Sequence, residues 1–439
     1  MPLVFPSVFS VSRFDGRKLL VIMTIVAVTL TVESQVSTVA DFIPEQLASN
    51  TGIVAFIGIW AVCSVMQYYI LAFIKHNNKK SSPRTKFVHS IHSIVTIVQF
   101  LLTGVIALVI LQILIAHEYN TIMLYIALSL SYGLWIVSLG LLAKALFSWY
   151  TSRKNFMVLL FALSMVAYVI NGVFGLYSEV DGLAKRSSII RSADVAIFPE
   201  SPSSINMVYQ IASSAGYVLT WIATVMLLRP YIEKLGKIKF WSIMVVAIGY
   251  YLITFPLFTL GYFTPSENSD AMTNILIFSL SAIFTGIIFG VAFLSVARTL
   301  KVGTAARNYM IIAAYGIILF YIAGSTLVSQ AAYPPYGLVS VSFAGLSCYL
   351  IYNGLYFSAI SVSQDMTLRQ SIRKSVMDQS KLLDDIGTAA MEKEVQKRVL
   401  TVVKKTSADM NERTGVEASM NEGEMKDYVE LVIKELRSK

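Results

Sequence analysis

Two histidines are the residues whose spacing comes nearest to a metal site. His89 and His92 stand near the start of a long apolar stretch. An i, i+3 pair lies on one face of a helix, where two imidazoles can bind a metal ion or a haem. A third ligand is missing, because His76 belongs to a loop and His117 to the opposite end of the stretch. A polar turn at a membrane interface is the preferred interpretation, so we expect no metal and no cofactor.

The other residue types that carry chemistry are scattered. The sequence contains no Ser/His/Asp set, no glycine-rich phosphate loop, no Cys-x-x-Cys and no paired carboxylates. Cys63 and Cys348 both fall inside apolar blocks, where a cysteine behaves as a small buried apolar side chain. We therefore predict no catalytic residues and a protein that is not an enzyme.

Three cations stand out in a connection that is otherwise acidic. Lys185, Arg186 and Arg191 lie in the segment 179–204. Such side chains can clamp an anionic ligand or rest on lipid headgroups. They are the candidate ligand-binding residues, although a plain solvated loop is the preferred interpretation.

The elements that must position these residues are membrane spans. Of the 439 residues, 56% are hydrophobic and only 14% are charged, whereas soluble domains carry charge on about a quarter of their residues. The apolar residues form blocks of about 20, the length that crosses a bilayer as a helix. The class is therefore all-α, a polytopic transmembrane bundle. We predict ten spans, at 18–35, 52–74, 87–116, 121–148, 156–178, 205–228, 240–263, 273–297, 308–332 and 337–361.

The charges of the connections alternate along the chain. One set of connections is strongly basic and includes Arg84, Arg153 and Lys237, whereas the other is mostly acidic and includes Glu33, Glu179 and Asp270. The positive-inside rule then places the N-terminus and the C-terminus in the cytoplasm of a cell-membrane protein. The net charge of +9 is an orientation signal of this kind, so we expect no nucleic-acid partner. A cleaved signal peptide in place of the first span is an alternative.

The spans themselves offer little for coupling to ions. Glu33 falls at the end of the first predicted span and we assign it to the external acids, so we expect no Asp or Glu inside a span. Intramembrane carboxylates usually carry coupled protons or sodium ions. Pro256, deep in the seventh span, is a candidate hinge because proline removes a helical hydrogen bond, although a packed structural kink is the preferred interpretation. Gly286 and Gly290 form a Gly-x-x-x-Gly motif, which favours close helix packing within the bundle. Mid-span tyrosines could line a polar cavity, although hydrogen bonds between helices are the preferred interpretation.

Residues 362–439 read as a cytoplasmic amphipathic helical tail that follows the bundle of residues 1–361. The stretch 355–386 has no glycine or proline, which predicts a rigid rod that continues the last span. Gly387 is expected to end this helix, with Thr388 as the N-cap of the next one. One stripe at helical spacing is the candidate binding surface for a cytoplasmic partner. It consists of Ile372, Val376, Leu383 and Ile386.

Several segments of the C-terminal half resemble a known group. They are Ala332-Tyr-Pro-Pro-Tyr-Gly337, the stretch from Ser361 to Ser375, Leu382-Leu-Asp-Asp-Ile-Gly-Thr388 and, more loosely, Leu227-Leu-Arg-Pro-Tyr231. The chain is similar here to archaeal multi-pass membrane proteins with a sensor-like architecture. The group has no established activity, so the resemblance implies no functional residues.

Two functions remain. The continuous rod and the lack of catalytic groups favour a membrane sensor or signal-transducing scaffold that reports to a cytoplasmic partner through the tail. The alternative is a channel or transporter for a small neutral or lipophilic solute, without carboxylate coupling. A membrane enzyme that uses His89 and His92 ranks below both.

Overall fold

The structure is a computed structural model of the chain. It describes residues 16–40, 43–81, 86–191, 203–259, 269–301, 303–326, 333–364, 383, 385–396, 399 and 401–402. Within these ranges the side chains of 16–17, 79–81, 86–89, 203–206, 234–235, 250–259, 269–275 and 278 lie outside the description.

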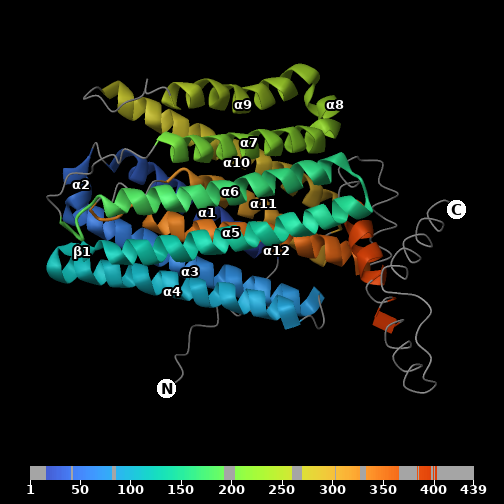
Figure 1. The fold of residues 1–439 in the computed structure, drawn as a ribbon, viewed down its shortest axis with the longest axis horizontal. Coiled ribbons are helices and arrows are strands. Elements are labelled where there is room, and N and C mark those ends of the chain that lie inside the picture. Colours follow the sequence, from blue (N-terminus) through green and yellow to red (C-terminus); the bar gives the residue numbers. More distant parts are fainter. Residues whose placement is uncertain are drawn as a thin grey trace.

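The described residues are almost entirely helical, as predicted. Long helices run side by side along one direction (Figure 1). Among the described residues, nine are long and apolar enough to cross a membrane, which indicates a multi-pass membrane protein. They are α1 (Gly16–Val39), α3 (Asn50–Ser81), α4 (Lys86–Ala116), α5 (Thr121–Ser152), α6 (Phe156–Ala184), α7 (Ser203–Leu228), α10 (Ser269–Thr299), α11 (Ala305–Gly324) and α12 (Leu338–Gln364).

A further long helix occupies the place of the seventh predicted span. This helix, α9 (Lys237–Thr259), runs beside α7 along the upper edge of the bundle in Figure 1. It continues through Pro256, whose side chain lies outside the description.

The last helix, α12, forms the centre of the bundle. Every residue from Leu338 to Leu355 is buried, and α12 packs chiefly against α11 and α5. Glycines at these contacts let the backbones of neighbouring helices approach closely. A Cβ added at Gly354 would lie 2.5 Å from the Ala313 nitrogen and 2.6 Å from the Tyr309 carbonyl oxygen, and one at Gly345 would lie 2.5 Å from the Ser131 carbonyl oxygen. Backbone atoms therefore fill the space that side chains would need.

The Gly-x-x-x-Gly motif of α10 acts as predicted. A Cβ added at Gly286 would collide with the Cβ of Tyr321, and one at Gly290 would collide with Ile318 of α11. The motif therefore brings α10 against α11 within the same bundle. Cys63 and Cys348 are likewise buried and free, as expected.

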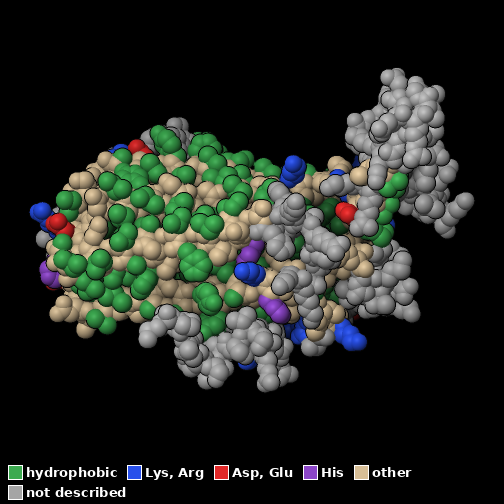
Figure 2. Space-filling view, turned by 90° about the horizontal axis from the view of Figure 1, so that it is seen from below, with side chains coloured by type: hydrophobic (Ala, Val, Ile, Leu, Met, Phe, Trp, Pro, Cys, Tyr) green, Lys and Arg blue, Asp and Glu red, His purple; other side chains and the backbone are tan. Residues whose placement is uncertain are grey.

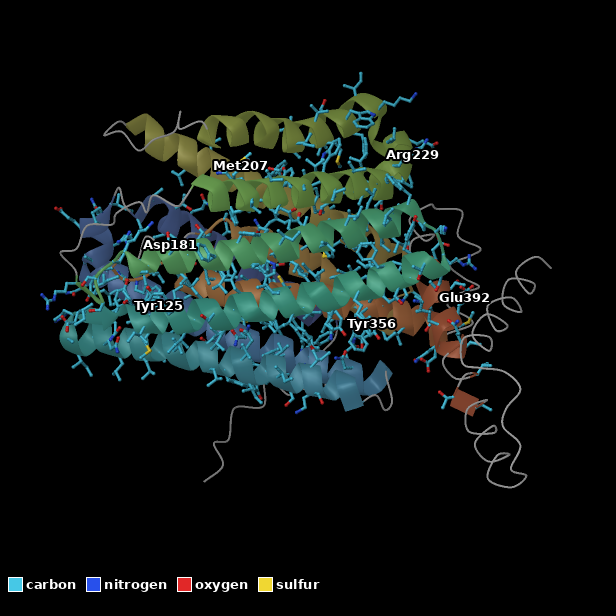
Figure 3. The ribbon with its side chains drawn as sticks, viewed as in Figure 1. Tyr125, Asp181, Met207, Arg229, Tyr356 and Glu392 are labelled. Carbon is cyan, nitrogen blue, oxygen red and sulfur yellow. The ribbon has the colours of Figure 1, made fainter. Side chains whose placement is uncertain are left out.

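The two ends of the bundle carry different short elements (Figure 1). At one end lie α2 (Pro44–Ala48) and a small antiparallel sheet of β1 (Glu118–Asn120) and β2 (Ile189–Arg191). At the other end lie the 3₁₀ turn η4 (Arg229–Tyr231), α8 (Ile232–Leu235) and the described part of the tail. Asp181 lies toward the first end, whereas Arg229 and Glu392 lie toward the second (Figure 3).

Apolar side chains cover much of the surface between the ends. Figure 2 shows them spread along the length of the molecule, with the charged side chains mostly toward its two ends. On α4, for example, Ile94, Ile97 and Leu111 are each at least half exposed. A wide apolar surface of this kind is what a lipid-facing bundle presents.

The prediction of a rigid rod from 355 to 386 is wrong. A straight helix would carry Gly387 about 38 Å beyond Val362, at 1.5 Å per residue. Instead, a Cβ added at Gly387 would lie 2.6 Å from Cγ1 of Val362, so the chain folds back onto the end of α12. Gly387 also does not end a helix, and Thr388 is not an N-cap, because residues 385–396 are helical throughout. We call this segment, residues 385–396, the tail helix.

Candidate functional site

A fully buried carboxylate lies at one end of α12. Glu33, on α1, is 0% exposed. It accepts hydrogen bonds from the backbone N–H of Gly337 at 2.5 Å, from the backbone N–H of Ser340 at 3.2 Å and from the Ser340 hydroxyl. The N–H groups of a helix's first turn lack partners within the helix and carry partial positive charge. Glu33 therefore caps the N-terminus of α12 from another helix.

The turn that leads into α12 holds this carboxylate in place. Gly337 has a φ of +97°, which a residue without a Cβ adopts readily, and an added Cβ would lie 2.5 Å from the Ser37 hydroxyl. Tyr336 donates a hydrogen bond to the Gly52 carbonyl at 2.7 Å. Burial, together with the nearby Glu33 carboxylate, raises the pKa of Tyr336 to about 12. The phenol therefore remains a donor at neutral pH.

The expectation that no carboxylate lies inside a span is wrong. Glu33 belongs to the apolar helix Lys18–Val39 and is fully buried, and Glu179, which is 6% exposed, belongs to the apolar helix Phe156–Ala184. Glu33 can be buried because a segment distant in sequence contacts it. The first turn of α12 gives Glu33 the hydrogen-bond donors that an isolated span could not supply. The absence of carboxylates can therefore no longer be used as evidence against ion coupling.

The tail helix docks at the opposite end of α12. Leu383, Ile386 and Ala389 are each at most 4% exposed. Gly387 lies against Val362 and within 3.6 Å of the Ala359 carbonyl oxygen, measured from its added Cβ. The apolar face of the tail thus covers the last turns of α12 instead of extending away from them.

Polar contacts join the tail helix to the turn between α5 and α6. Arg153 lies 3.8 Å from Asp385 and 3.6 Å from Glu392, nitrogen to oxygen. Asn155 donates to Asp385 at 2.6 Å, and the Lys393 ammonium donates to the Ser148 hydroxyl. The tail helix therefore contacts α5, the turn between α5 and α6, and the end of α12.

The mid-span tyrosines bond between helices, which was the preferred interpretation. Tyr168 on α6 bonds to Tyr321 on α11 and, at 3.1 Å, to Thr220 on α7. Tyr217 on α7 donates to Thr285 on α10 at 2.8 Å or to the Ala247 carbonyl on α9 at 2.7 Å. These hydroxyls form two buried sets of hydrogen bonds, which together join α6, α7, α9, α10 and α11.

His92 has a protein partner. Its Nδ1 lies 3.0 Å from the Tyr349 hydroxyl on α12, to which Asn353 also donates at 3.3 Å. The side chain of His89 lies outside the description. No group of three or more His, Cys, Asp or Glu side chains that could hold a metal ion occurs in the part of the chain that is described.

The structure pairs two of the three candidate ligand-binding cations with acids of the chain itself. Lys185 lies 2.8 Å from Asp181, and Arg191 lies 3.0 Å from Glu118 across the β1–β2 sheet. Arg186 lies in the turn after α6. Lys185 and Arg191 thus already have carboxylate partners, and the anion-binding role of the three stays a prediction.

The four residues of the predicted partner-binding stripe have two different outcomes. Ile372 and Val376 lie outside the described residues, whereas Leu383 and Ile386 are buried against the chain's own bundle. Sequence reasoning missed Glu33 and Arg153, which organise the two ends of α12. For Glu33 one signal was present: Gly337 precedes α12 without a capping side chain, so an acceptor has to come from elsewhere.

The fold and this pair of end sites define a multi-pass α-helical membrane protein with a helix from its C-terminal tail docked on the bundle. No family model, no curated protein and no solved structure matches the chain. The resemblance to archaeal multi-pass proteins with sensor-like architecture therefore stays a prediction.

Proposed function

We propose that this protein is a membrane sensor or signal-transducing scaffold, in which the bundle reports to the cytoplasm through the tail. The observation that carries the proposal is the docking of the tail helix on the end of α5, on the turn between α5 and α6 and on the end of α12. A change in the bundle that moves these ends would release the tail helix. Leu383 and Ile386 would then become available to a cytoplasmic partner.

The proposal includes ten spans, with α9 as the seventh, and both termini in the cytoplasm. The alternation of basic and acidic connections supports this orientation. Reporter fusions after Arg84, Lys237 and Lys439 are expected to read cytoplasmic, and one after Asp270 is expected to read external. An external signal at Lys439 would contradict the orientation on which the proposed function depends.

The free energy of docking of the tail helix comes from a few contacts and is opposed by the entropy of ordering the segment. Arg153 is one-third exposed in its pairs with Asp385 and Glu392, and ion pairs at such sites contribute at most about 1 kcal/mol each. Burial of Leu383 and Ile386 adds about 2 kcal/mol each, against the entropy of ordering the segment. Because the entropy of ordering opposes these contributions, a modest change at the ends of the bundle can shift the tail helix from docked to released.

A transporter for a small neutral or lipophilic solute is the second candidate. It is favoured by the two buried sets of hydrogen bonds among Tyr168, Tyr217, Thr220, Thr285 and Tyr321, which place hydroxyls in the middle of the bundle. These hydroxyls bond to one another, and α12 fills the centre of the helices. The sensor is therefore the better-supported function.

Charge reversal at Arg153 tests the sensor proposal. Arg153→Glu places a carboxylate opposite Asp385 and Glu392, so it should shift the tail helix from docked to released. We suggest spin labels at Thr151→Cys and Val402→Cys, which are both exposed, and measurement of their separation in lipid nanodiscs. Wild type is expected to show a mainly docked population, and Arg153→Glu a released fraction about tenfold larger, which corresponds to 1.4 kcal/mol.

The matched control for this charge reversal is Lys154→Glu, which changes the same charge at the next, exposed position. It should leave the distances close to those of wild type. A tail helix that stays docked in Arg153→Glu, or solute flux through vesicles that is indifferent to the position of the tail, would contradict the sensor.

A further inference from the structure

We infer that Glu33 is a proton-binding site whose occupancy controls docking of the tail helix through α12. The inference rests on the proposed function, because it names the stimulus for that tail. It joins the two end sites of α12. The ligand is a proton from the side of the membrane opposite the tail.

The surroundings of Glu33 hold a negative charge by hydrogen bonds alone. Its donors among the described residues are the N–H groups of Gly337, Val339 and Ser340 and the Ser340 hydroxyl, all at the start of α12. The titratable groups that face it are Cys63 on α3 and Tyr336 in the connection before α12. Both groups are neutral when protonated, so neither supplies a balancing positive charge.

The remaining helices packed against α1 present hydroxyls near Glu33. Ser325 at the end of α11 bonds to Ser34 at 2.8 Å, and Ser279 on α10 accepts from Gln35 at 2.8 Å. The charge of Glu33 therefore depends on the position of the first turn of α12. In water-free surroundings an unbalanced carboxylate is costly, so the carboxylate and this turn stabilise each other.

Proton binding changes this balance without breaking a covalent bond. A proton taken up from water adds to a carboxylate oxygen of Glu33 and removes the negative charge that the N–H groups of Gly337 and Ser340 bind. The favourable interaction with the positive end of α12 is lost with it. Protonation thus favours conformations in which the first turn of α12 has moved away from α1.

The geometry of α12 carries such a movement to the tail. The helix has 27 residues, which corresponds to about 40 Å. Ser131 of α5 donates to the Val341 carbonyl and accepts from the Gly345 N–H, and Gly354 packs on the backbone of α11. Closely packed helices rearrange as units, so a shift at Glu33 displaces Ala359 and Val362, on which Gly387 rests.

The test is a pH titration of tail docking in the full-length protein. The labels at Thr151→Cys and Val402→Cys report the ratio of docked to released tail helix in nanodiscs. In wild type this ratio is expected to fall with decreasing pH, by at most about tenfold per pH unit for one proton. Glu33→Gln should keep the tail mostly released at every pH, because the amide carries no charge for the N-terminus of α12.

Two further variants serve as controls for Glu33→Gln. Glu33→Asp retains a titratable group and should retain the pH response. Glu179→Gln removes the charge of the other buried carboxylate and should titrate as wild type does. A wild-type ratio that is indifferent to pH, or a Glu33→Gln variant that titrates like wild type, would overturn the inference.

The inference and the proposed function fail in different ways. If Arg153→Glu releases the tail but pH does not, the tail is a reversible output and Glu33 is only a structural cap. If Arg153→Glu leaves the tail docked, the proposed function itself fails, and the role of Glu33 as a control of the tail fails with it.

Discussion

Substitution of Gly354 by valine is expected to destabilise the bundle by about 3 kcal/mol, at the upper end of overpacking effects. A Cβ at this position would lie 2.5 Å from the Ala313 nitrogen and 2.6 Å from both the Ala313 Cβ and the Tyr309 carbonyl oxygen. These are backbone atoms or atoms fixed to the backbone of α11, so they cannot turn aside as a flexible side chain can. The two helices must instead move apart.

The measurement is the fraction of protein that stays monodisperse after heating in detergent, followed by size-exclusion chromatography. The matched control is Gly140→Val on α5, where nothing lies within 4 Å of an added Cβ. The control should unfold close to the wild-type temperature. Equal losses in the two variants would show that the contact of α11 and α12 is not as close as described.

A disulfide between α12 and the tail helix is expected to hold the tail docked. An added Cβ at Gly387 lies 3.0 Å from the Cβ of Val362, and disulfides join Cβ atoms at about 3.8 Å. A small adjustment would therefore let Val362→Cys and Gly387→Cys form a bond. Cys63 and Cys348 are buried, so they should not compete.

The disulfide between residues 362 and 387 should cancel the effect of Arg153→Glu on the tail helix. In the oxidised Val362→Cys/Gly387→Cys protein, Arg153→Glu should no longer increase amide exchange in the tail helix, whereas reduction should restore the increase. The single cysteine variants serve as controls. A pair that does not oxidise, or an oxidised pair in which Arg153→Glu still frees the tail, would contradict this account of docking.

Hydropathy and packing motifs predicted what depends on local sequence. Apolar blocks located the long helices because each span must satisfy its own backbone. The spacing of Gly286 and Gly290 located a close helix contact because small residues let two backbones approach. These inferences need no knowledge of where distant segments lie.

The two ends of α12 depend on contacts that sequence spacing does not encode. Glu33 stands near the end of an apolar run, where an acid ordinarily faces water, and its partner Gly337 is 304 positions away. The stretch 355–386 lacks a helix breaker, so local propensity favoured a straight rod. Apolar burial of Leu383 and Ile386, with the charges around Arg153, favours the folded-back arrangement instead.

Hydrogen–deuterium exchange in nanodiscs measures the reversible docking of the tail helix. Amides in 385–396 are expected to be protected relative to an unfolded peptide but to exchange much faster than those in 338–355, since local opening needs less free energy than global unfolding. Exchange in the tail helix should also rise in Arg153→Glu while that in α12 does not. Protection of the tail helix equal to that of α12 and unaffected by Arg153→Glu would make it a fixed part of the bundle. That result would contradict the account.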